Sequence, residues 1–124
     1  MKEVTVRQER RRGPRIEKDI PLKLRIGEYD IVTSTSNLSS VGAYCCVGRY
    51  LEPLTKLKIM LLLPQPKDNK KVATRKVECE GVVVRIEGPF DNPPQYNVAI
   101  FFSDIDKAEA KKISEFVNHH LSIE

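Results

Sequence analysis

Apolar and polar side chains alternate through the middle of this 124-residue chain with the two-residue period of half-buried β-strands. The segment 20–26 shows this alternation, and apolar residues at positions 29, 31 and 32 continue the strand beyond Gly27. Polar stretches rich in Ser, Asn, Gly and Pro predict loops over residues 33–40, 64–69 and 88–94. The segments between them predict further strands over residues 42–48, 56–63, 72–87 and 95–102.

The strand predicted over residues 72–87 has two faces of different character. Strict alternation assigns one face to Val77, Cys79, Gly81, Val83 and Arg85. It assigns the other face to Val82, Val84 and Ile86. On this assignment Arg85 shares a face with the valines that are candidates for the core.

The end of the chain changes from strand to helix spacing. Its apolar residues form one stripe, which consists of Ala110, Ile113, Phe116, Val117 and Leu121. Asp106 is placed to act as N-cap, and Glu109 follows three residues later, as in a capping box. We therefore expect a helix over about residues 106–121 that docks through its apolar stripe.

Together these elements predict a mainly β fold over residues 20–124. The expected architecture is a small antiparallel, Greek-key-like β-barrel of about six strands with a C-terminal α-helix. Residues 1–19 are expected to form a flexible, arginine-rich arm with little packing of its own. No apolar run approaches the roughly 18–20 residues that span a bilayer, and the charged N-terminus lacks an apolar signal-peptide core. We therefore expect a cytoplasmic protein without membrane insertion.

The net charge of +4 is concentrated at the N-terminus. The first 25 residues hold nine basic and four acidic side chains, whereas the other 99 hold 12 basic and 13 acidic ones. A protein that coats long nucleic acid usually carries a basic stripe across its folded surface. A basic arm on a near-neutral body fits a compact anion better, with DNA binding by the arm as an alternative.

No constellation typical of an enzyme occurs in the sequence. His119 and His120 end the predicted helix, and no nucleophile is suggested beside them. There is no phosphate-binding glycine motif and no zinc-protease motif. The three cysteines lack CxxC spacing, and the adjacent Cys45 and Cys46 point to opposite faces of a strand. We therefore expect structural cysteines and no metal site.

Two short polar motifs remain as candidate chemistry. Arg11-x-x-x-Arg15 offers planar guanidinium groups that match phosphate oxygens and the O6/N7 edge of guanine. Asn37-x-Ser39-x-x-Gly42 lies at a strand–loop–strand junction, where its residue types also suit ordinary turn chemistry. About twenty residues separate the motifs, enough for one strand and its loop. We expect the two motifs to meet at one end of the barrel.

In this order, the two motifs make the chain resemble the PilZ domain, a bacterial receptor for cyclic di-GMP (c-di-GMP). The resemblance extends to the stretch Gly81-Val82-Val83-Val84-Arg85, the strand over 96–102 and the terminal amphipathic helix. The chain departs from the family pattern at Ala99, where many members carry Gly, and we interpret that position as structural. Asn37 stands where Asp is commoner and is an accepted variant.

The resemblance implies a role for each motif residue. Arg11 and Arg15 grip the phosphates and guanine edges of the ligand. Asn37 and Ser39 hydrogen-bond a guanine edge. Gly42 leaves room for close approach of the backbone.

The resemblance also implies how the arm works. Arg10 occupies the place that accompanies two stacked ligand molecules, so we expect a stacked dimer of c-di-GMP, and Arg12 has an auxiliary role. The arm is expected to become ordered over the nucleotide and to switch the interaction with a downstream protein partner. That partner is not identified by the sequence, and a monomer and a homodimer both remain open.

Two other functions remain as alternatives. A PilZ-like adaptor would act through protein contacts alone without binding the nucleotide. A small barrel that binds RNA or DNA through the arm is less favoured, because single-strand binders place aromatic side chains on an exposed sheet. Several of the eight tyrosines and phenylalanines occupy expected core positions here.

Overall fold

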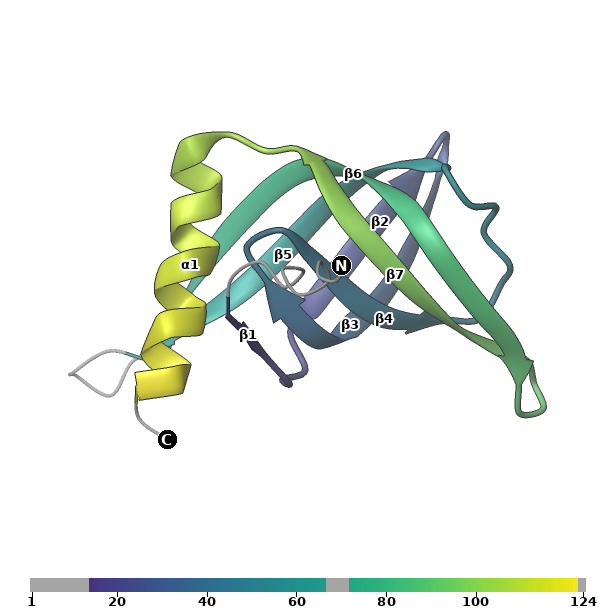
Figure 1. Ribbon diagram of the computed structural model, residues 1–124, viewed down its shortest axis with the longest axis horizontal. Helices are drawn as coiled ribbons and strands as arrows, with labels where there is room; N and C mark the ends of the chain where they lie inside the picture. The colour runs from purple at the N-terminus through teal and green to yellow at the C-terminus, as the bar shows by residue number, and fades with distance from the viewer. Residues whose placement is uncertain (1–13, 67–71, 123–124) are drawn as a thin grey trace, which may run out of the picture.

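The computed structural model describes residues 14–66 and 72–122 of the chain (Figure 1). These residues form the strands β1 (Arg15–Ile16), β2 (Pro21–Ile26), β3 (Tyr29–Ser39), β4 (Gly42–Val47), β5 (Lys56–Pro66), β6 (Val72–Phe90) and β7 (Gln95–Asp104), followed by the helix α1 (Lys107–Ser122).

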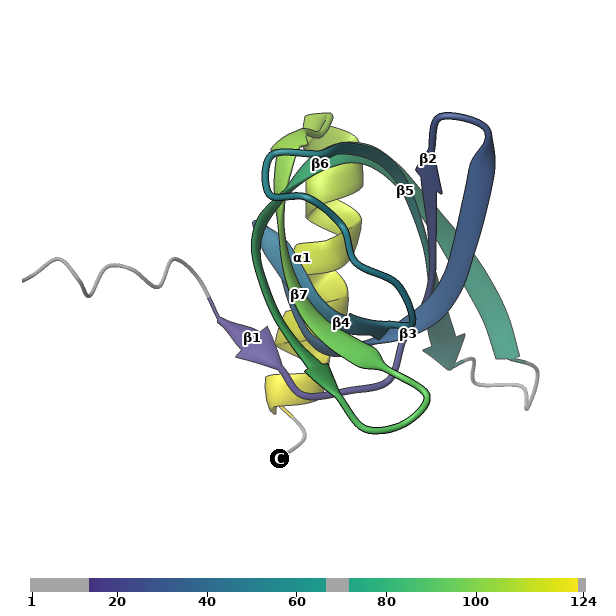
Figure 2. The ribbon, with the colours of Figure 1, turned by 90° about the vertical axis from the view of Figure 1, so that its right-hand side faces the viewer.

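Six antiparallel strands close into a barrel. The sheet order is β1-β3-β2-β5-β6-β7-β4, and β4 also pairs with β3, so the strands from β2 to β7 form a ring. Figure 2 shows this ring end-on, with α1 behind it. Closure leaves few strand edges open to other chains. The predicted fold of a six-stranded barrel with one C-terminal helix is therefore confirmed.

The core fills the barrel and continues under α1. Leu24, Leu61 and Val83 show the inward alternation of their strands, each being fully buried. The helix adds Ile113, Phe116 and Val117, which are at most 2% exposed. Each side chain of this size stabilises the fold by about 1.5–3 kcal/mol when buried. The predicted apolar stripe docks as expected at these three positions, whereas Leu121 is 41% exposed.

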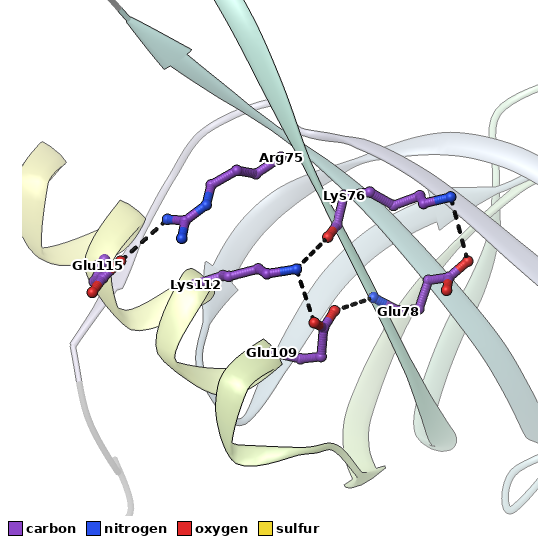
Figure 3. Close-up of polar contacts among 6 residues, drawn as sticks. All are labelled: Arg75, Lys76, Glu78, Glu109, Lys112 and Glu115. Atoms are coloured by element: carbon purple, nitrogen blue, oxygen red, sulfur yellow. Dashed lines mark hydrogen bonds and ion pairs between the residues drawn. The ribbon is translucent and has the colours of Figure 1, made fainter.

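Polar contacts attach the first half of α1 to β6 (Figure 3). The β7 pairing of β6 begins only at Glu80, so the preceding part of β6 has an edge without a strand neighbour. Along this edge the Glu109 carboxylate accepts the Glu78 N–H at 2.8 Å, and Lys112 donates to the Lys76 carbonyl at 3.0 Å. Lys112 also pairs with Glu109 at 2.9 Å. Helix side chains thus satisfy main-chain groups that a strand would otherwise pair.

The expected capping box at Glu109 is not formed. Glu109 is used by Lys112 and by the Glu78 amide, which together hold the pKa of this carboxyl below its ordinary value of 4.5. A charge-assisted hydrogen bond to an otherwise unpaired strand amide stabilises more than a bond at a solvated helix end. Asp106 still precedes the helix, and its carbonyl accepts the Ala110 N–H at 2.9 Å.

The loop predicted over residues 33–40 is wrong, because β3 continues to Ser39. Thr33, Thr35 and Ser36 of this segment donate their hydroxyl protons to main-chain carbonyl groups. Thr35 is 1% exposed, and its hydroxyl accepts the Ile20 N–H at 3.1 Å and donates to the Lys18 carbonyl at 2.7 Å. Only Ser40 and Val41 remain between β3 and β4. Similarly, β5 runs past the expected turn at residue 64 to Pro66.

The described part of the predicted arm, residues 14–19, packs against the barrel. Arg15 and Ile16 pair with Ser39 and Leu38 of β3, and Ile16 is 8% exposed. Ile16 is the only buried residue among 14–19, so this segment has little packing of its own beyond one apolar side chain and a two-residue strand pairing. The rest of the arm, including Arg10, Arg11 and Arg12, lies outside the described residues.

Candidate ligand-binding site

A surface pocket of about 310 Å³ lies where β1 and the β3–β4 turn meet the outer faces of β4, β6 and β7. Its polar lining consists of Arg15, Asn37, Ser39, Tyr44 and Arg85, and its other lining residues are Val41, Gly42, Ala43, Val84, Ala99, Ile100 and Phe101. The structure thus brings together all the described site residues that the two motifs predict. The pocket also contains Tyr44 and Arg85, which belong to neither motif.

Arg15 reaches the pocket because of its neighbour Ile16. Successive strand residues point to opposite faces, so the buried Ile16 side chain leaves the Arg15 side chain exposed. The pairing of Arg15 with Ser39 places this cation directly beside the second motif. A guanidinium group at this position meets the requirement for binding a phosphate or a guanine edge.

A β-bulge turns Asn37 toward the same pocket. Thr35 pairs with Cys45 but Asn37 pairs with Tyr44, so Ser36 is an extra residue in β3. Without it, alternation would place Asn37 in the interior. With it, Leu38 is fully buried, and Asn37 lies on the outer face.

Ser39 and Gly42 shape the turn between β3 and β4. The Ser39 hydroxyl accepts the Val41 N–H at 3.2 Å and donates to the Gly42 carbonyl at 3.5 Å. A Cβ at Gly42 would clash with the carbonyl oxygen of Ile100 on β7. Gly42 thus allows a close backbone approach between β4 and β7, whereas its implied role toward a ligand stays a prediction.

A second bulge moves Arg85 to the outer face. Val83 pairs with Ile100 and Arg85 with Ala99, so Val84 is the extra residue in β6. The predicted face assignment is therefore wrong at this end of the strand: Arg85 and Val84 are both exposed, and Ile86 packs against the core. A two-residue period contains no signal for a bulge, which is why the sequence did not reveal Arg85 as a site residue.

Arg85 and Tyr44 form the far wall of the pocket. The Arg85 guanidinium donates a hydrogen bond to the Tyr44 hydroxyl, lies 5.6 Å from the centre of that ring and pairs with Glu87 at 3.6 Å. Both side chains belong to one row across the sheet, in which Asn37 pairs with Tyr44, Tyr44 with Ala99 and Ala99 with Arg85. The small Ala99 is the floor between them, so its departure from the family pattern concerns the pocket as well as the fold.

Exposed apolar side chains complete the lining. The exposed fractions are 42% for Val41, 51% for Val84 and 48% for Phe101, and Tyr44 is 37% exposed. Aromatic and aliphatic surface beside cationic groups suits a planar ligand with charged substituents. The site therefore combines a surface for contact with a ring and groups for binding an anion.

A second depression, of about 450 Å³, lies on the outer face of β2, β5 and β6. Lys23, Arg25 and Lys58 line one side, and Glu78 and Glu80 line the other. Because its charges are of both signs, this surface lacks the concentrated positive charge of an anion site.

Metal and thiol chemistry find no support in the part of the chain that the structure describes. Among residues 14–66 and 72–122 there is no cluster of three His, Cys, Asp or Glu side chains suited to a metal ion. Cys45 is buried and Cys46 exposed, which confirms their opposite faces. Burial raises the pKa of Cys45 and of Cys79 to about 12, so both thiols stay protonated near neutral pH. Over the same ranges, no helix has the length and apolar content that crossing a membrane requires.

The structure is therefore a small, closed β-barrel domain with a C-terminal helix and a candidate ligand pocket on its outer wall. The sequence model of the PilZ domain matches residues 9–119, and the chain belongs to this family. PilZ domains are receptor or adaptor domains. No match is found among curated proteins.

Solved structures share the fold. Bacillus subtilis inhibitor of motility (MotI/DgrA) aligns with a TM-score of 0.76 at 19% identity, covering 92% of this chain and 52% of that one. The PilZ domain of Escherichia coli YcgR with c-di-GMP aligns with a TM-score of 0.62 at 10% identity, covering 92% of this chain and 93% of that one. Borreliella burgdorferi PlzA in complex with c-di-GMP aligns with a TM-score of 0.53 at 15% identity, covering 93% of this chain and 54% of that one. The chain thus spans about half the length of MotI and PlzA.

Proposed function

We propose that this chain is a cytoplasmic, bacterial receptor domain for c-di-GMP. The observation that carries the proposal is the pocket in which Arg15 of β1 lies beside Asn37 and Ser39 of β3. The YcgR and PlzA structures, which contain c-di-GMP, support the same ligand class. In this proposal the domain binds a nucleotide and carries out no catalysis.

The pocket chemistry matches the two kinds of group in this ligand. Arg15, with Arg11 four residues before it, supplies guanidinium donors for the phosphates and for guanine O6 and N7. The Asn37 amide hydrogen-bonds a guanine edge. The Ser39 hydroxyl has a long 3.5 Å bond to the Gly42 carbonyl, so its proton is available to a guanine acceptor.

The far wall contributes a third cation and a contact surface. Arg85 faces the pocket from the side opposite Arg15, and its bond to the Tyr44 hydroxyl fixes the guanidinium before the ligand arrives. Preorganised donors bind more tightly because less side-chain entropy is lost. Phe101 and Val84 offer apolar surface to the bases.

The arm completes the site. A pocket of about 310 Å³ is at the small end for ligand sites, so part of the nucleotide extends beyond it and is covered by the arm. Each charge-assisted bond contributes about 1.5–3 kcal/mol, and several of them offset an ordering cost of about 1–2 kcal/mol per residue. Arg10 sets a stoichiometry of two stacked ligand molecules, and Arg12 is auxiliary. Ordering of the arm then changes the surface offered to a protein partner.

Calorimetric titration of matched variants tests these roles. Arg11→Ala and Arg15→Ala are expected to weaken c-di-GMP binding by at least about tenfold, since each removes a charge-assisted contact. Arg25→Ala removes the same charge at a remote position, where Arg25 pairs with Asp30 at 3.5 Å, and should leave the affinity unchanged. Undiminished affinity in both arm variants, with intact circular dichroism spectra, would contradict the assigned roles.

One observation favours a second function. Tyr44 and Phe101 are exposed aromatic side chains beside cationic groups, which is also how single-stranded nucleic acids are bound. A parallel titration with a single-stranded oligonucleotide distinguishes the two functions, because we expect binding of c-di-GMP alone. An adaptor that acts only through proteins would bind neither.

A further inference from the structure

The strand β1 lies between the ligand pocket and the helix α1. Its first residue, Arg15, lines the pocket, whereas the next, Ile16, belongs to the core cluster that includes Phe116 and Val117 of α1. Figures 1 and 2 both show β1 beside the C-terminal half of the helix. Two adjacent side chains on one short strand thus connect the pocket with the helix.

A small cavity of about 30 Å³ marks this junction. It is lined by Pro14 before β1, by Ser40 in the β3–β4 turn, and by Ser114, Val117 and Asn118 of α1. Ser40 directly follows Ser39 of the second motif. Both polar motifs of the site therefore border the same part of the helix surface.

The two halves of α1 are held differently. The first half, residues 107–115, is attached to β6 by the bonds of Glu109 and Lys112 and by the pairing of Glu115 with Arg75 at 3.1 Å (Figure 3). The C-terminal half, residues 116–122, packs on β1 and the β3–β4 turn through Val117. A change in β1 should consequently act mainly on the C-terminal half of the helix.

The attachment of β1 is slight. It pairs with β3 through Arg15 and Ile16 alone, so it belongs to the parts of a fold that open at low free energy. A ligand that binds Arg15 binds only the closed form of β1 fully and shifts its population toward that form.

We propose that β1 couples the pocket to the C-terminal half of α1, so that this half of the helix reports ligand occupancy at the surface. The inference rests on the proposed function and deepens it by naming the element that changes. Coupling is reciprocal: if ligand binding favours the docked form of α1 by a given factor, then the ligand binds the undocked form more weakly by the same factor.

Hydrogen exchange of the full chain with and without c-di-GMP tests whether ligand binding stabilises the C-terminal half of α1. Ligand is expected to slow exchange of the amides at 116–121 by about fivefold or more, the lower end of usual coupling, and to leave those of β5 unchanged. Binding without a change at 116–121 would overturn the coupling. This result differs from failure of the proposed function, in which c-di-GMP would not bind at all.

A pair of helix variants tests the reverse direction. Val117→Ala should weaken c-di-GMP binding by about fivefold or more, whereas Ile113→Ala, equally buried in the half held by β6, should not. Equal effects of the two variants on affinity, or no effect of either, would contradict a route through β1.

An experiment without ligand tests separately whether β1 stabilises the packing of the C-terminal half of α1. Ile16→Ala should accelerate amide exchange at 116–121 without changing β5, and Ile16→Val offers a milder change if the first variant does not fold. Unchanged exchange in the folded variant would show that β1 does not hold the helix, whatever the ligand proves to be.

Discussion

At the scale of single residues, two extra residues decide which side chains enter the site. Ser36 in β3 and Val84 in β6 are bulge residues, and each moves the following side chain, Asn37 or Arg85, from the inward to the outward face. The row from Asn37 through Tyr44 to Arg85 exists only because both bulges are present. The two bulges therefore decide which side chains line the pocket.

The wall formed by Arg85 and Tyr44 yields a prediction. Arg85→Ala should weaken c-di-GMP binding by about tenfold or more, because a charge-assisted contact is lost. Tyr44→Phe should have a smaller effect, since it removes the hydroxyl that holds the guanidinium but keeps the ring. Titration calorimetry measures both, with Lys58→Ala as the control for charge. Full affinity in Arg85→Ala would exclude this wall from the site.

Gly42 offers a prediction about stability rather than affinity. Gly42→Ala should lower the free energy of unfolding by about 1–3 kcal/mol, because the added methyl meets the Ile100 carbonyl. Gly48→Ala is the matched control: its nearest neighbour is the Gln95 side chain at 3.9 Å, so the substitution should be nearly neutral. Urea unfolding of both variants checks this, and equal midpoints would contradict the tight approach of β4 and β7.

At the scale of elements, the apolar pattern predicts much but not everything. The strands from β2 to β7 and the docked helix follow from periodicity, because burial of one face selects the register. The polar segment 33–40 was misassigned as a loop because Ser and Thr suit both turns and strands. Pairing with β2 and β4, which are brought to it by the tertiary fold, makes this segment a strand. The bonds between α1 and the edge of β6 could not be predicted either, because they join side chains to main-chain groups of a strand distant in sequence.

That edge gives a pH-dependent prediction. The pKa of Glu109 is lowered in the fold, so its contribution is fully present above its ordinary value of 4.5 and is lost as pH falls through the lowered value. Glu109→Gln should therefore reduce the free energy of unfolding by about 1 kcal/mol near neutral pH, and the difference should shrink as the pH falls through the lowered pKa of Glu109. Urea unfolding across this range is the measurement. A difference that grows toward acid would contradict the role of the carboxylate.

At the scale of the whole molecule, the barrel is a rigid support for a site on its outer wall. The two motifs predict a meeting of arm and loop at one end of the barrel; Arg15, Asn37, Ser39 and Gly42 do line one pocket, but this pocket lies on the outer wall. They could not reveal the contribution of Tyr44, Phe101 and Arg85, which come from strands distant in sequence. Of the described residues near the N-terminus, Arg15 lines this pocket, and its neighbour Ile16 belongs to the same core cluster as Phe116 and Val117 of α1.

The most direct test of the central claim is a calorimetric titration of the unmodified chain with c-di-GMP at low and at physiological salt. We predict saturable binding of two ligand molecules per chain that weakens as salt rises, because cationic side chains contact phosphates. The same titration with a single-stranded oligonucleotide should give no saturable heat. Absence of c-di-GMP binding at both salt concentrations would contradict the account.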